Sequence, residues 1–341
     1  MLTGRENAVA TREARAKVKE RPSTPREAKS ATASTKPASL RVAESGADEP
    51  LAGILLVMAS MIVFSCSDAT AKYLTQSLPA VEVAWLRYAT FVVLIVPAIV
   101  RHGGTRLHSR NPGLQLVRGF TLLASSLFFI LAISAMPMAD ATATTFVSPL
   151  LTTALSIPFL GEKVGIRRWA AIVVGMIGVI IVVRPGTSAF NPAAVFPLLS
   201  AASWSLAMVI TRKMSGADGM ITMLTYAAGS GFVALSMALP LVWVTPVLWQ
   251  VALGIFIGIA SSAGQWLVVL AYRRADASVL APFSYSQIVW SSLLGMAVFG
   301  NVPDAQTMIG AAVIVASGIY TAHRERAVRR RRPAPPGKTA A

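Results

Sequence analysis

The chain has 341 residues, of which 54% are hydrophobic and 13% charged. Soluble domains carry about 25% charged residues, so this composition excludes an ordinary soluble protein and indicates lipid as the main solvent. The net charge of +16 flanks apolar stretches, where Lys and Arg set membrane orientation or contact anionic lipid, and nucleic-acid binding is not expected. The single cysteine, Cys66, excludes an intrachain disulfide framework.

The first 50 residues are rich in Ala, Ser, Thr, Pro and charge. They hold too few large apolar side chains to offset the entropy of ordering, so we expect 1–50 to be a disordered basic tail. No apolar stretch precedes Leu51, which argues against a signal peptide. The segment 323–341 is also basic, and we expect it to be a second disordered tail.

Ten apolar stretches follow one another between these tails, separated by short breaks that hold Pro, Gly, Asn or charge. A membrane-spanning helix needs about 20 mainly apolar residues. These stretches are apolar on every side, unlike the amphipathic helices of a soluble protein. The predicted spans are 51–73, 81–100, 113–134, 140–160, 168–184, 192–212, 220–242, 247–270, 277–299 and 304–322.

The second half of the chain repeats the first. Aligning 118–141 with 254–277 gives nine identities in 24 positions, including Ala-Ser-Ser and Ala-Asp-Ala at the same offset of 136. A compositional bias toward Ala and Leu would not readily produce these tripeptides. We therefore predict two repeats of five helices each, 51–186 and 192–322.

Single positions extend the match beyond that segment. Lys72 matches Arg212 at an offset of 140, and Gly161 matches Gly300 at 139. The register therefore drifts by only a few residues over five spans, as a duplicated unit would.

Basic residues fall almost entirely on one side of the predicted spans. With both termini cytoplasmic, ten Lys or Arg lie in cytoplasmic loops and one, Arg184, lies in an outer loop. Because five is an odd number, the second repeat must be inverted, a plan that recurs in secondary transporters. The predicted fold class is an all-α integral membrane protein with ten transmembrane helices as two inverted five-helix repeats.

Four motifs resemble the drug/metabolite transporter superfamily, specifically proteins with two EamA-type domains. They are Trp85-Leu86-Arg87-Tyr88, Phe159-Leu160-Gly161-Glu162, Val174-Gly175-Met176-Ile177-Gly178-Val179 and Ala281-Pro282-Phe283-Ser284-Tyr285-Ser286-Gln287. Their order and spacing carry the resemblance, which covers about residues 51–322. It implies solute transport and a location in the cytoplasmic (inner) membrane.

Residues 68–73 and 298–304 are similar to the bacterial branch that includes S-adenosylmethionine and riboflavin transporters. The family often has Glu after the Gly that ends the fourth helix of the second repeat, whereas this chain has Asn301. Because Asn is neutral, it cannot form the ion pair that a Glu could form at this position. The first repeat keeps Glu162.

Three ionisable residues lie well inside predicted spans, where a charge costs about 2.5–3.5 kcal/mol. Asp68 and Lys72 are four residues apart and share a helix face. They could form a solute or proton site, or an intrahelical ion pair. Arg87 could hold a carboxylate or phosphate of a solute, or pair with Asp68 across helices.

Uncharged polar groups in spans eight and nine complete the candidate site. Gln265, Tyr285 and Gln287 could line a cavity, or they could form ordinary hydrogen bonds between helices. The predicted substrate-binding residues are Asp68, Lys72, Arg87, Tyr88, Gln265, Tyr285 and Gln287.

Catalytic patterns are weak. The three histidines lie outside the spans, and the chain has no phosphate-binding Gly-Lys-Ser/Thr loop. We expect no enzyme activity, no cofactor and no metal.

The expected function is secondary transport of a small organic metabolite by alternating access, coupled to protons or to exchange, with Asp68 as the proton carrier. The alternatives are an exporter of drugs or excess metabolites and, from another class, a membrane scaffold or enzyme. The expected partners are a small-molecule solute and the lipid bilayer, with a homodimer left open.

Overall fold

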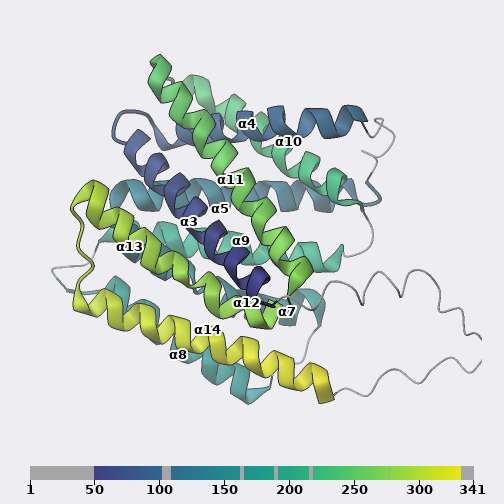
Figure 1. Cartoon of the computed structure of the whole chain (residues 1–341), viewed down its shortest axis with the longest axis vertical. Coiled ribbons are helices and arrows are strands. Elements are labelled where there is room, and N and C mark those ends of the chain that lie inside the picture. Colours follow the sequence, from purple (N-terminus) through teal and green to yellow (C-terminus); the bar gives the residue numbers. More distant parts are fainter. Residues whose placement is uncertain are drawn as a thin grey trace, which may run out of the picture. The chain divides into compact units, whose positions relative to one another are not determined.

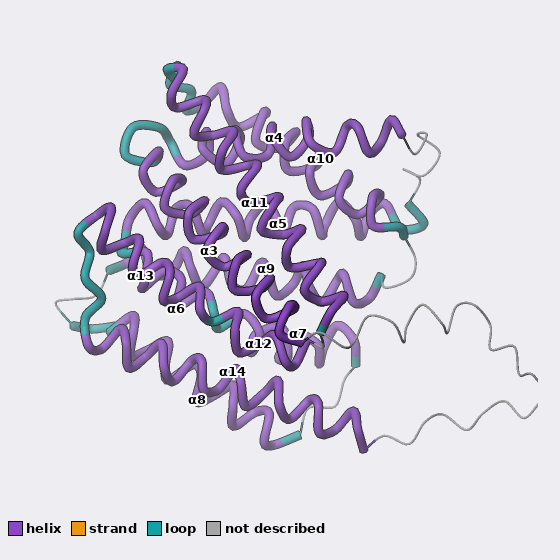
Figure 2. Tube along the Cα trace, viewed as in Figure 1, coloured by secondary structure: helices purple, strands orange, loops and turns teal. Residues whose placement is uncertain are grey.

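A computed structural model of the chain describes residues 50–101, 109–161, 165–187, 191–214, 218–275 and 277–331. Every regular element in these ranges is helical (Figure 2), which confirms the predicted all-α class for them. The predicted tail 1–50 lies outside them, apart from Pro50. The α-helices are α3 Pro50–Leu74, α4 Ala80–Arg101, α5 Pro112–Ala135, α6 Met138–Thr145, α7 Ser148–Leu160, α8 Ile166–Val183, α9 Val195–Lys213, α10 Met220–Ala238, α11 Leu248–Arg274, α12 Ala277–Ser284, α13 Ser286–Phe299 and α14 Ala305–Arg331. Two short 3-10 turns, η2 Pro192–Ala194 and η3 Leu239–Leu241, adjoin α9 and α10.

Within the described residues, seven helical stretches are long and apolar enough to cross a membrane. They are Leu51–Leu74, Ala80–Arg101, Pro112–Ala135, Met138–Leu160, Pro192–Lys213, Ile221–Leu241 and Leu248–Arg274. Shorter apolar stretches, Trp169–Val183 and Ala305–Thr321, fall in predicted spans five and ten. With α12 and α13 in the ninth range, helices occupy all ten predicted ranges.

Large apolar side chains point outward from these helices. Val100 on α4 is 73% exposed, Met237 on α10 is 77% exposed and Leu248 on α11 is 86% exposed. Many more apolar side chains are exposed on the other helices. Exposed apolar surface on this scale indicates a lipid or partner interface, so the outer surface agrees with the membrane composition of the sequence.

The helix packing follows the sequence repeat. The most extensive contacts pair α3 with α11, α5 with α9, and α8 with α14, and α4 packs against α10 (Figure 1). Exchanging the first five predicted spans for the second five maps the α3–α11 pair onto α9–α5. It also maps α8–α14 and α4–α10 onto themselves. The same exchange relates the packing of α13 on α3 to that of α7 on α9. The duplicated sequence therefore produces a duplicated set of helix contacts.

Glycines allow the close approach of α8 and α14. A Cβ atom added to Gly310 would lie 2.6 Å from Val182 Cγ2 and 2.8 Å from the Gly178 carbonyl oxygen. Small residues at helix crossings are the usual means of close packing in membranes. The small-residue motif in span five thus serves packing.

Predicted spans four and nine each contain a break that the sequence analysis missed. The first lies at Phe146 and Val147, between α6 and α7, and the second lies at Tyr285, between α12 and α13. Pro149 and Pro282 lie near these breaks, and proline removes a helical hydrogen-bond donor. The Phe146 and Tyr285 rings lie 4.9 Å apart between centroids, so the two breaks meet.

Matched glycines end the broken helices. Gly161 follows α7 with φ of 67°, and Gly300 follows α13 with φ of 70°. This left-handed conformation favours glycine and commonly ends helices. The sequence match between these two positions therefore has the same structural cause in both repeats.

The last helix is longer than predicted. We expected span ten to end at 322 and a disordered tail to follow, but α14 continues to Arg331. Residues 319–332 contain no Gly or Pro and include Arg, Ala and Glu, which favour helix. A basic helical segment therefore occupies the start of the predicted tail.

A polar cluster ties the end of α8 to the starts of α14 and α6. The Arg184 side chain donates hydrogen bonds to Asp304 and Thr307, and the Thr307 hydroxyl donates to Asp140 Oδ1 at 2.8 Å. The Thr307 backbone N–H donates to Asp304 Oδ1 at 2.8 Å. Asp140 on α6 thus contacts α14 through its side chain.

The Arg184–Asp304 pair should give a small, acid-sensitive contribution to stability. The hydrogen bond from Arg184 lowers the pKa of Asp304 to about 2. Because this folded-state pKa lies below the unfolded value, the contribution is present above about pH 4 and is lost as the pH falls through about 2. The Asp304 side chain is 52% exposed, so we expect less than about 1 kcal/mol. The melting temperatures of the wild type and Asp304→Asn should differ slightly at pH 7 and approach each other near pH 2.5. An undiminished difference at acid pH would assign the effect to the Thr307 hydrogen bond instead.

Candidate solute-binding site

A buried carboxylate joins helices from the two repeats. Asp68 on α3 is 8% exposed, and Gln287 Nε2 on α13 donates a hydrogen bond to its Oδ2 at 3.3 Å. α13 packs against α3, and the hydrogen bond spans 219 residues of sequence. The structure thus brings together two predicted site residues that lie far apart in the chain.

Lys72 does not form the intrahelical ion pair with Asp68 that was one of the two alternatives. Its ammonium group donates hydrogen bonds to the carbonyl oxygens of Ile133 at 2.5 Å and Met136 at 2.7 Å. These carbonyls belong to the end of α5, where helical acceptors lack a partner and attract cations. The Phe299 ring lies 5.3 Å from the same ammonium. Lys72 therefore connects the end of α3 to the end of α5.

Arg87 is half-buried on α4, and its guanidinium lies 5.6 Å from the Phe91 ring. Its Nε is buried and has no hydrogen-bond partner within the described ranges. Neither a hydrogen bond nor an ion pair within 4 Å joins Arg87 to Asp68. Its hydrogen-bonding capacity is therefore available to a solute.

Two predicted site residues serve helix packing. A Cβ atom added to Gly231 of α10 would lie 2.2 Å from the Tyr88 ring, so Tyr88 fills the α4–α10 contact. The Tyr285 hydroxyl lies where a Cβ atom on Gly318 would be, 1.7 Å away, so Tyr285 packs against α14. Tyr285 also lies at the meeting point of the two helix breaks, where a change of helix angle would move it.

Gln265 is not brought to the other candidates. It lies on α11 with its side chain exposed, next to Trp266, which is 64% exposed. Because an all-apolar helix has no periodic polar face, the sequence does not show which side of such a helix faces the protein. We therefore place Gln265 outside the site that Asp68 and Gln287 form.

Three buried polar atoms close to Asp68 and Gln287 in sequence belong to residues outside the predicted site set. Ser65 Oγ, Ser286 Oγ and Trp290 Nε1 are buried and have no hydrogen-bond partner among the described residues. Buried polar atoms are nearly always hydrogen-bonded, so these atoms are candidates for contact with solute or water. Ser65 lies one turn before Asp68, and Trp290 lies one turn after Gln287.

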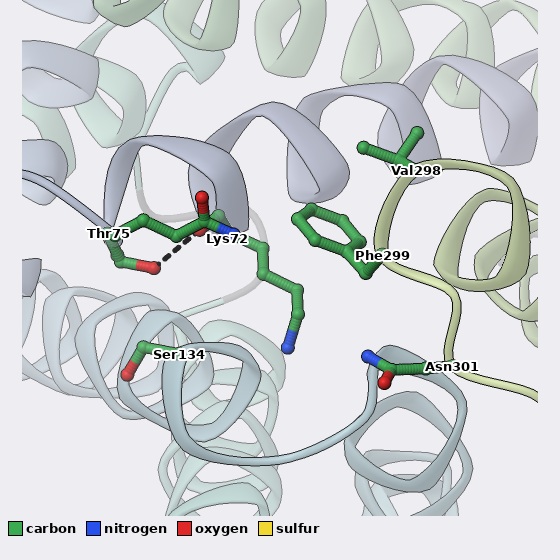
Figure 3. A pocket seen from close by; sticks show the side chains of 7 residues that line it. Lys72, Thr75, Ser134, Val298, Phe299 and Asn301 are labelled. Atoms are coloured by element: carbon green, nitrogen blue, oxygen red, sulfur yellow. Dashed lines mark hydrogen bonds between the residues drawn. The ribbon is translucent and has the colours of Figure 1, made fainter.

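A pocket of about 410 Å³ opens where α3, α5 and α13 end. Figure 3 shows the Lys72 ammonium pointing into the space between Ser134 and Asn301. The residues that line the pocket are Lys72, Thr75, Gln76, Ser134, Val298, Phe299 and Asn301. The position at which the chain departs from the family pattern therefore lies beside the cation of the candidate site.

Comparisons with known proteins agree with this architecture. A model of the EamA-like transporter family matches residues 51–184 and 191–322. A solved crystal structure superposes with a TM-score of 0.56 over 82% of this chain and 99% of its own, at 21% identity. At that identity the similarity shows a shared fold alone.

Curated relatives align with this chain over nearly their whole length. An S-adenosylmethionine uptake transporter of Rickettsia bellii is 30% identical over 80% of this chain and 94% of its own. A riboflavin transporter of Vibrio cholerae is 32% identical over 79% and 92%. A pseudopaline exporter of Pseudomonas aeruginosa is 30% identical over 78% and 94%. With both halves matched by the family model, the chain belongs to the EamA-like transporter family.

Proposed function

We propose that this chain is a secondary transporter that carries a small organic metabolite by alternating access of two inverted repeats. As a family member with several apolar helices, it is a multi-pass protein of the cytoplasmic membrane. We assign it ten transmembrane helices, with both termini in the cytoplasm. The symmetric helix packing and the ten-to-one distribution of basic residues support this assignment.

The observation that carries the proposal is the buried contact between Asp68 and Gln287. A charge inside the membrane is costly, so it usually faces a pathway or a partner. Here the Asp68 carboxylate has one hydrogen bond and no ion-pair partner among the described residues. Helices of both repeats contribute to this site, as expected for a site at the interface of inverted repeats.

The relatives suggest which solutes to test first. S-adenosylmethionine and riboflavin are carried by two of the relatives, according to their names, and a third is named an exporter. We propose S-adenosylmethionine as the first candidate, with riboflavin and amino-acid-like solutes next. Export is the alternative direction. Transport is favoured over a scaffold or enzyme because these relatives are named for transport. The lipid bilayer and a solute are the proposed partners, nucleic acid is not, and a homodimer stays a prediction.

A transported solute should stabilise the purified protein. A ligand present at 100 times its dissociation constant stabilises the folded state by about 2.7 kcal/mol. We therefore expect a saturable rise in unfolding temperature in detergent for one member of a panel that contains S-adenosylmethionine, riboflavin, amino acids and nucleosides.

Two variants localise the binding. Gln287→Ala should weaken the apparent affinity about tenfold, since it removes a polar contact from the site. Gln265→Ala is the matched control, because Gln265 is exposed on the outer side of α11. An equal loss in both variants would refute the Asp68–Gln287 site. No saturable shift for any compound would contradict the proposed solute classes.

A further inference from the structure

The pocket at the ends of α3, α5 and α13 has one charged group and several neutral polar groups. Lys72 provides the charge, while Thr75, Gln76, Ser134 and Asn301 provide hydroxyl and amide groups. Its volume of about 410 Å³ lies within the usual range for small-molecule sites of about 300–1,000 Å³. The pocket can therefore hold a small metabolite or one end of it.

Within the part of the chain that the structure describes, no carboxylate neutralises the positive charge of Lys72. Its side chain is 9% exposed, and its hydrogen-bond acceptors are the neutral carbonyl oxygens of Ile133 and Met136. Among the described residues, Lys72 makes no ion pair within 4 Å. A buried cation without a counter-charge is costly, so an anion that enters the pocket would gain from this charge.

The geometry leaves one donor of Lys72 for a ligand. An ammonium group has three N–H donors, and two of them are used by the α5 carbonyls. Figure 3 shows the ammonium facing Asn301 across the pocket. A glutamate at 301 would place a carboxylate in this space, whereas the neutral Asn301 leaves the cation available and can itself donate a hydrogen bond.

We propose that this pocket is an entry or exit subsite that binds the carboxylate of the transported solute. The inference deepens the proposed transport function and rests on it. Its substrate class is small metabolites that carry a carboxylate, whether anionic or zwitterionic. A single cation suits a single negative charge, so a carboxylate fits better than a phosphate, which carries nearly two charges at neutral pH.

The test compares paired compounds on the full-length protein in detergent. The probes are S-adenosylmethionine with its decarboxylated analogue, amino acids with their amides, and a phosphate monoester of similar size. Binding is read from the concentration dependence of the unfolding temperature. Uptake of the same radiolabelled compounds into proteoliposomes is measured in parallel. We expect the wild type to prefer the carboxylate of at least one pair by about tenfold or more.

Two substitutions at one position test the role of the charge. Asn301→Glu should pair with Lys72 and abolish the carboxylate preference. Asn301→Gln has the same length without the charge and should keep the preference. Lys72→Gln should abolish it as well, which covers the outcome that Asn301→Glu fails to fold.

The outcomes separate this inference from the proposed function. Transport of a solute without a carboxylate preference, or a preference that survives both Asn301→Glu and Lys72→Gln, would overturn the inference and leave the transport function standing. Preference for the phosphate monoester would also overturn it. If no compound binds and none is transported, both proposals are contradicted.

Discussion

Asp68→Asn should strongly reduce proton-driven accumulation of solute while leaving exchange of solute across the membrane in place. The substitution keeps the shape of the side chain and an oxygen that accepts the hydrogen bond from Gln287. It removes a carboxylate that can gain or lose a proton, which is the group that we expect to couple transport to protons. A neutral amide can still take part in alternating access, so the defect should lie in coupling.

The size of the effect follows from the burial of Asp68. The side chain is 8% exposed, and a hydrogen bond to a charged group contributes about 1.5–3 kcal/mol. Losing this charge should therefore reduce gradient-driven accumulation by about 10- to 100-fold. The measurement is solute uptake into proteoliposomes with and without an imposed pH gradient, together with an internal pH dye that reports proton movement.

Asp140→Asn provides the matched control for this experiment. Asp140 is a second acid in a membrane helix, but its carboxylate accepts a hydrogen bond from Thr307 in the polar cluster at the ends of α8 and α14. We expect Asp140→Asn to retain the response to the pH gradient. Full gradient-driven accumulation by Asp68→Asn would rule out Asp68 as the proton carrier.

The helices could be predicted because their signal is local. Each apolar range is bounded by Pro, Gly or charge, and helices occupy all ten predicted ranges. The breaks at Phe146 and Tyr285 were missed because a proline near the centre of an apolar stretch can either kink or break a helix. Which of these occurs depends on contacts with other helices, here the ring contact between the two breaks.

The candidate site could be predicted only in part because its contacts are distant in sequence. The sequence points to Asp68 because a carboxylate within an apolar stretch is costly unless it faces a cavity or a partner. Its partner Gln287, however, is 219 residues away in the chain. The acceptors of Lys72 are backbone carbonyls, which no residue pattern reveals. Gln265 was selected for its polarity alone, and its exposed position could not be known before the helix had an orientation.

Lys72 and its repeat counterpart Arg212 make different contacts in this structure. This difference predicts how the transporter changes between its two access states. α3 packs mainly on α11, and α5 packs mainly on α9. Lys72 bridges these two pairs at one end of the bundle, where it is 9% exposed. Arg212, in the last turn of α9, is exposed and makes no hydrogen bond or ion pair to another described residue. The Lys72 contact therefore joins the two helix pairs at one end of the bundle, which we call the tied end. The matching Arg212 contact at the other end is not formed among the described residues.

During alternating access of two inverted repeats, the Lys72 contact should break at one end while the matching Arg212 contact forms at the other. When the α3–α11 and α5–α9 pairs rock apart at the Lys72 end, the Lys72 contacts must break. Arg212 should then dock on the last carbonyls of α11, which match those of α5. Because hydrogen bonds to a charged group contribute about 1.5–3 kcal/mol, removing the Lys72 tie should shift the population toward the state open at that end by about 10- to 100-fold.

A cysteine at position 136 can report this shift. Met136 is 7% exposed at the tied end, and substitution of its side chain leaves the carbonyl that accepts from Lys72 in place. In a Cys66→Ser background, we expect Lys72→Met to raise the rate at which an externally added, membrane-impermeant maleimide labels Met136→Cys by about tenfold or more. Lys72→Arg, which keeps the charge, should label slowly. Arg212→Met should not raise the rate, because the Arg212 side chain makes no hydrogen bond or ion pair to another described residue while the Lys72 contact is formed.

Equal labelling with and without Lys72 would show that the contact with α5 does not hold this end closed. Rapid labelling in Arg212→Met would show that the two ends do not alternate.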